Sequence, residues 1–121
     1  NTAKTNVEEL GMHVAIPYET DEAVWRQDQD NKKITAVLRL SSQDADKLTK
    51  RAEAIKPPEP AVVSAEAWFP AELIAQSEMS GDNTVKGTSY AADEFYLPPY
   101  TDGKIMRAEN TDYFILELVS K

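Results

Sequence analysis

The stretch KIMRAENTDYFILELV, residues 104–119, is the part of the sequence that decides the fold. A strand, a polar turn and a second strand follow one another in it, over residues 104–108, 109–112 and 113–119. On the second strand Tyr113 and Ile115 lie on one side and Phe114 and Leu116 on the other, so both sides are largely apolar. The sequence therefore predicts a C-terminal β-hairpin whose last strand is central in a sheet.

A strand followed by a helix is predicted upstream of this hairpin. Residues 33–40 alternate between two sets of side chains, which is typical of a strand. Ser41, with Asp44 three residues later, resembles a capping box at the start of a helix. An apolar stripe at helical spacing then follows, made of Ala45, Leu48, Ala52 and Ile55. We expect this helix to end at Lys56, because two prolines follow it.

Shorter segments complete the expected order of elements. They are a strand over residues 12–18, a short helix over 21–25, a turn at 28–31, a strand at 61–63, a helical segment over 64–68, a second short helix with Pro70 in its first turn, a turn at 80–83, and extended segments at 87–90 and 97–100. This order predicts an α+β fold, a single small domain with helices packed on one face of a mostly antiparallel sheet.

The start of the chain differs in composition from the rest. Residues 1–10 open with small polar side chains, and we expect them to be a flexible leader to a single α+β domain over residues 11–121. The chain begins with Asn1 and shows no signal-peptide pattern, which favours a processed exported protein or a lipoprotein cut after its lipidated residue. A fragment of a cytoplasmic protein would begin in the same way.

The composition excludes several classes of function. The chain has 121 residues, no cysteine and a net charge of -8. Without cysteine it has no disulfide scaffold, thiolate zinc site or cysteine nucleophile. Nucleic acid is an unfavourable partner, because a phosphate backbone is bound by clustered Lys and Arg. The apolar runs are short, so no membrane span is expected.

Motifs for chemistry are absent or incomplete. His13 is the only histidine and has no second metal-ligating residue at a suitable spacing. Residues 28–31 begin like a calcium loop but are followed by two lysines and lack the glycine and the final glutamate of such a loop. The proline clusters at 57–60 and 97–100 are interpreted as rigid connectors. We therefore predict no catalytic residue, no metal site and no cofactor.

Aromatic and acidic side chains gather in the C-terminal half of the chain. The predicted binding residues are Trp68, Phe69, Glu72, Asp93, Glu94, Phe95, Tyr96 and Tyr100. Aromatic anchors ringed by charge are typical of protein interfaces. The alternative is that the aromatics of residues 90–100 pin their own loop to the core. The sequence leaves both interpretations open.

Three hypotheses for function follow from these observations. The first is a non-enzymatic protein-binding domain whose acids steer a basic protein or peptide towards it. The second is an acidic inhibitor or immunity-type protein that blocks a basic enzyme. The third is a small hydrolase that uses carboxylates or His13.

Overall fold

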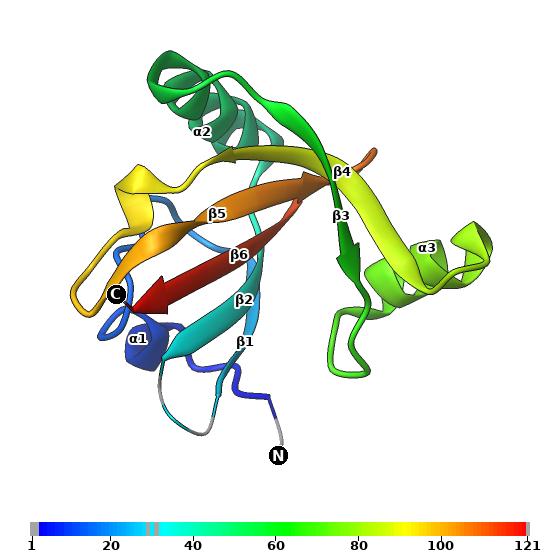
Figure 1. Ribbon diagram of the computed structural model, residues 1–121, viewed down its shortest axis with the longest axis horizontal. Coiled ribbons are helices and arrows are strands. Elements are labelled where there is room, and N and C mark those ends of the chain that lie inside the picture. The colour runs from blue at the N-terminus through cyan, green and yellow to red at the C-terminus, as the bar shows by residue number, and fades with distance from the viewer. Residues whose placement is uncertain (1–2, 29, 31, 121) are drawn as a thin grey trace.

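The computed structural model describes residues 3–28, 30 and 32–120 of the chain. Figure 1 shows a twisted antiparallel sheet with helices packed against it. In chain order the elements are α1 (Val7–Leu10), β1 (Glu22–Gln27), β2 (Lys33–Arg39), α2 (Ser42–Ile55), β3 (Glu59–Ser64), α3 (Ala71–Ser80), β4 (Thr84–Ala91), the 3-10 turn η1 (Asp93–Phe95), β5 (Tyr100–Ala108) and β6 (Tyr113–Ser120). The predicted α+β class, antiparallel sheet and C-terminal hairpin are confirmed.

The described strands form one six-stranded sheet in the order β1-β2-β6-β5-β4-β3. β6 lies between β2 and β5, so the prediction that the last strand is central is confirmed. In this register Leu116 of β6 stands between Ala36 of β2 and Ile105 of β5. Because alternate residues of a strand point to opposite sides, the register decides which side chains share a face of the sheet.

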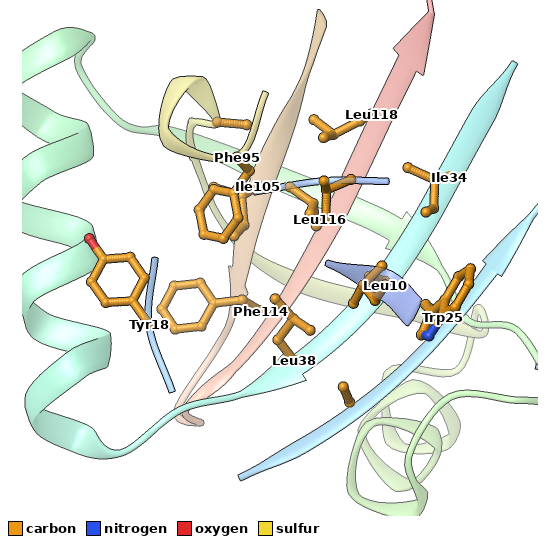
Figure 2. Close-up of a cluster of buried hydrophobic side chains, with 14 of the residues drawn as sticks. Leu10, Tyr18, Trp25, Ile34, Leu38, Phe95, Ile105, Phe114, Leu116 and Leu118 are labelled. Carbon is orange, nitrogen blue, oxygen red and sulfur yellow. The ribbon is translucent and has the colours of Figure 1, made fainter. Parts of the chain in front are cut away.

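One face of the sheet, called here the α2 face, is covered by α1, α2 and η1. It carries buried side chains of the central strands, among them Leu38 and Leu116 (Figure 2). α2 begins where the sequence predicts, since Ser41 Oγ accepts a hydrogen bond from the Asp44 N–H (3.1 Å). The first three members of the predicted apolar stripe are buried, whereas Ile55, at the end of the helix, is 51% exposed.

The opposite face, called here the α3 face, has a second core. Val37, Ile115 and Met106 are buried there together with Leu73 of α3. The expectation of helices on one face therefore holds for α2, while α3 lies on the other face. The physical reason is β6, which is apolar on both sides and so requires cover on both.

Residues 12–18, predicted to be a strand, form a loop along the α2 face instead. Val14 and Tyr18 are buried in that core, which explains the alternating pattern. The Val14 N–H bonds the Leu10 carbonyl (3.1 Å) and the Ala15 N–H bonds the Phe95 carbonyl (3.0 Å). Met12, the first residue of the pattern, is 76% exposed, so the alternation marks inward side chains only from Val14 onward. No neighbouring strand is needed to produce it.

Residues 21–25, predicted to be a helix, contribute to strand β1 instead. Trp25 is fully buried and stands opposite Ala36 of β2. Acids after a threonine resemble a helix start, but pairing with an apolar neighbouring strand outweighs this local preference. The helical segment predicted over 64–68 is also wrong, because β3 continues through Ser64, a turn closed by the Phe69 N–H to Glu66 carbonyl bond (3.0 Å) follows, and the next helix begins at Ala71.

Two connecting segments, residues 28–31 and 97–100, are closed by local hydrogen bonds. At residues 28–31 the Asp28 side chain accepts a hydrogen bond from the Lys32 N–H (2.8 Å), while residues 29 and 31 lie outside the described part. At residues 97–100, predicted to be extended, Leu97 and Tyr100 exchange backbone hydrogen bonds of 3.1 and 2.8 Å around a cis Pro98–Pro99 bond. The second segment is therefore a closed turn.

Residues 3–10, predicted to belong to a flexible leader, pack against the domain, and residues 1–2 lie outside the described part. Leu10 is fully buried in the core of the α2 face. Lys4 exchanges two backbone hydrogen bonds with Trp25, of 2.7 and 2.8 Å. The Trp25 indole N–H also donates to the Asn6 carbonyl (3.1 Å). This segment therefore completes the α2 face and lies along the outer edge of β1.

Candidate functional site

The structure divides the predicted binding residues between the core and both faces of the sheet. Phe69, Phe95 and Tyr100 are buried, with 5%, 1% and 1% of their surfaces exposed. Phe95 and Tyr100 belong to the core of the α2 face, and Phe69 to that of the α3 face. Their prediction as surface anchors is wrong, because large aromatics contribute most of the apolar area that a small core can bury.

Glu94 and Tyr96, beside or within η1, make contacts inside the chain. The Tyr18 hydroxyl donates to Glu94 Oε2 (2.8 Å), and Arg51 Nη1 donates to Glu94 Oε1 (3.2 Å). Burial of the Tyr18 hydroxyl raises its pKa above the ordinary value, and the hydrogen bond with the Glu94 carboxylate raises it further. The Tyr96 hydroxyl donates to a backbone carbonyl of β5 (3.2 Å). Glu94 therefore joins η1 to α2, whereas its neighbour Asp93 is exposed.

Trp68 and Glu72 lie on the other side of the sheet, close to α3. Trp68 is half-buried and meets Phe69 edge-on, with ring centroids 4.9 Å apart. Its indole N–H donates to Glu66 Oε1 (3.1 Å), and Arg26 Nη1 lies 3.9 Å from the same oxygen. Glu72 is exposed. The sheet separates these residues from η1, so the structure does not assemble the predicted residues into one surface.

Trp68 borders a part of the α3 face that α3 does not cover. One row of side chains across the strands is apolar and packs beneath α3, namely Val24, Val37, Ile115 and Met106. The next row, also in register, consists of Arg26, Thr35, Glu117 and Lys104. These four side chains are polar, and each is accessible to solvent. This second row together with Lys33 is called here the open half of the α3 face.

Two hollows lie over the open half. The larger has a volume of about 520 Å³, and its charged lining residues are Lys33, Lys56, Lys104, Glu59, Asp102 and Glu117. The smaller has a volume of about 210 Å³ and includes Trp68, Arg26, Thr35, Glu66 and also Lys33, so the two adjoin. A Glu117 oxygen lies 3.4 Å from Lys33 Nζ, and the other lies 3.9 Å from Lys104 Nζ. These pairs join three neighbouring strands and restrain the charged side chains.

The open half was not predicted from the sequence because its residues come from two strand pairs, β1 with β2 and β5 with β6, that are far apart in the chain. One signal was present in the sequence. Glu117 is the only charged residue among residues 113–119, a segment that is apolar on both sides. A charge inside a central strand indicates where a face of the sheet meets solvent, because an unpaired buried charge is costly.

The rest of the described chain carries few features of other kinds of site. The His13 ring packs near Trp25, with centroids 5.6 Å apart. Within residues 3–28, 30 and 32–120, no group of three or more His, Asp or Glu side chains is placed to hold a metal ion. None of the helices in that part of the chain has the length and apolar character needed to cross a membrane. In comparisons with known proteins, no family model, no curated protein and no solved structure matches this chain.

Proposed function

We propose that the protein is a non-enzymatic protein-binding domain and that its partner docks on the open half of the α3 face. The supporting observation is a contrast within one face of the sheet. Val37 and Ile115 are buried beneath α3, whereas Thr35 and Glu117, one row further, are open to solvent. Rigid strands hold this surface in place before binding, so little conformational entropy is lost when a partner docks.

Trp68 and Arg26 are the anchors that we expect to contribute most to binding. Tryptophan and arginine are enriched among the residues that dominate interface energies. Trp68 packs edge-on against Phe69 and bonds Glu66, which restrains its ring beside the smaller hollow. Of the binding residues predicted from the sequence, Trp68 is the one that this proposal keeps.

The charges favour a basic partner that also carries some acids. The net charge of -8 attracts a basic protein from a distance and speeds the encounter. At short range Lys33 and Lys104 flank Glu117, so the docking surface carries both signs. Such a pattern fixes the orientation of the partner. The alternative function, an acidic inhibitor of a basic enzyme, would use the same attraction. Inhibition of the captured partner's activity would distinguish this alternative.

Affinity capture with charge-matched variants tests the proposed surface. We expect the wild-type protein to retain a partner that the double variant Arg26→Ala and Lys104→Ala loses. The matched control is Lys47→Ala with Lys50→Ala, which removes two exposed positive charges from α2, on the opposite face. Because the net charge changes equally, a general electrostatic effect would weaken both double variants alike.

The partner identified in this way is then purified and titrated against each variant. An affinity at least tenfold weaker for the Arg26 and Lys104 variant, with the control unchanged, supports the proposal. Equal affinities for the two double variants contradict it. A salt series completes the test, since steering by net charge weakens as ions screen it.

A further inference from the structure

The two edge strands of the sheet differ in what lies beside them. The Lys4 N–H donates to the Trp25 carbonyl (2.7 Å), and the Trp25 N–H donates to the Lys4 carbonyl (2.8 Å), so the outer edge of β1 has a partner. β3 pairs with β4 on one side, and no segment of the described chain pairs with its other side. The outer edge of β3 is therefore a row of backbone groups available for pairing.

The register shows which backbone groups of β3 point outward. The Ala65 N–H donates to the Asn83 carbonyl (3.0 Å), one position beyond the β3–β4 ladder. Since bonded and non-bonded residues alternate along an antiparallel strand, odd-numbered residues bond β4 and even-numbered residues point outward. Pro60 agrees with this, because its missing N–H falls on the outer side. The edge thus offers the N–H groups of Val62 and Ser64 and the carbonyls of residues 60, 62 and 64.

We propose that β3 pairs antiparallel with β3 of a second copy of this chain, about a two-fold axis at Val62. Each Val62 then exchanges two hydrogen bonds with its counterpart, and each Ser64 N–H donates to the opposite Pro60 carbonyl. Val62 is the middle one of the three outward positions within β3, so this is the two-fold register that uses all of them. The inference rests on backbone groups of β3 and does not need the docking proposal, although residues 59–62 and the open half line one hollow.

The side chains of β3 suit this register. Val62 is 55% exposed and would pack against its counterpart. Ala61 would stand opposite Val63, and both already pack beside the core of the α3 face. Glu59 would stand opposite Ala65, so the register places no like charges opposite each other.

Hollows lie on both faces of the sheet beside β3. A hollow of about 610 Å³ lies along one face, where Pro58, Pro60 and Val62 form part of its wall. Residues 59–62 also line the hollow of about 520 Å³ on the other face. One six-residue strand covers less area than a standard interface, so we expect a dimer that dissociates in the micromolar to millimolar range.

Single cysteines test the register directly, because the natural chain has none. In the proposed pairing the two Val62 Cα atoms are about 5.5 Å apart, which suits a disulfide. The two Ser64 Cα atoms are offset by about 13 Å along the strands, beyond the reach of a disulfide. Under mild oxidation of concentrated protein, we expect Val62→Cys to form a covalent dimer and Ser64→Cys to remain monomeric.

Sedimentation equilibrium tests the pairing without a crosslink. We expect the apparent mass of the wild-type protein to rise with concentration, and that of Val62→Lys to stay at one chain because two charges would meet at the axis. Circular dichroism checks that the variant is folded. A wild-type mass of one chain up to millimolar concentration would overturn the dimer. Wild-type dimers without the Val62→Cys crosslink, or equal crosslinking of Ser64→Cys, would overturn the register.

Discussion

The two faces of the same sheet differ in how completely they are covered. On the α2 face Phe114, Leu116 and Leu118 of β6 are all fully buried (Figure 2). On the α3 face Ile115 is buried, but Glu117 of the same strand is partly exposed. One strand therefore contributes to a complete core on one side and to half a core on the other.

This difference suggests that the two faces have separate tasks. Burial of apolar area stabilises a fold, so the covered face should carry most of the stability. The open half adds little apolar burial, and its substitution should leave stability nearly unchanged. Stability and binding should then respond to different residues, and four substitutions test this separation.

The largest loss is expected for Phe114→Ala, in the core of the α2 face. Phe114 is fully buried, and removing such a ring costs about 3–5 kcal/mol of unfolding free energy. Urea unfolding followed by circular dichroism measures this cost. A loss below about 1 kcal/mol would show that the α2 face does not carry the stability assigned to it.

A smaller loss is expected for Gly103→Ala, where β5 approaches β6 closely. Gly103 has φ of +143°, a conformation that other residues rarely adopt. A Cβ at this position would also overlap the backbone carbonyl of Glu117. We expect a loss of about 2 kcal/mol or more in the same unfolding measurement. Gly81→Ala is the comparison. Its φ of +82° also disfavours a side chain, but a Cβ there meets no atom within 4 Å, so this variant measures backbone strain without the overlap.

Tyr18→Phe should cost about 1 kcal/mol at neutral pH, since it removes the hydrogen bond to Glu94. Burial raises the pKa of Tyr18 above its ordinary value of 10.0. A raised folded-state pKa gives stability that is complete below pH 10 and is lost as the pH rises through the raised value. The difference in unfolding free energy between the wild-type protein and Tyr18→Phe should therefore disappear above pH 10. A difference that stays constant into that range would contradict this linkage.

The smallest effect on stability is expected for Thr35→Ala, on the open half of the α3 face. Thr35 is partly exposed and lies in the polar row beside the covered core. We expect its unfolding free energy to change by no more than about 0.5 kcal/mol. A loss close to that of Phe114→Ala would show that both halves of the face are structural, and the proposed separation of tasks would fail.

Sequence-based prediction succeeded where local signals agreed with the fold. Residues 104–119 carry strand pattern, turn residues and strand pattern in succession, and they form the second half of β5 and nearly all of β6. The Ser41 cap and the stripe after it correctly predicted α2. It failed at residues 21–25, where acids after Thr20 favoured a helix but the deciding contact of Trp25 is with Ala36 on the neighbouring strand.

The candidate site was less predictable than the fold. An aromatic residue has the same identity in a core and at an interface, so the sequence could not distinguish buried Phe95 and Tyr100 from surface anchors. The open half is formed by strand register, which places Arg26 beside Thr35 and Thr35 beside Glu117. No short stretch of sequence contains that arrangement.

The amino-acid sequence by itself determined the α+β class, the central last strand, the α2 helix and the negative net charge of the chain. Periodicity and capping residues act within a few neighbouring residues, and composition does not depend on where the residues lie in space. The tertiary structure alone decided that α3 covers half of one face and leaves the other half open. That outcome depends on how six strands align side by side in the described chain, and on which rows of side chains the alignment brings together.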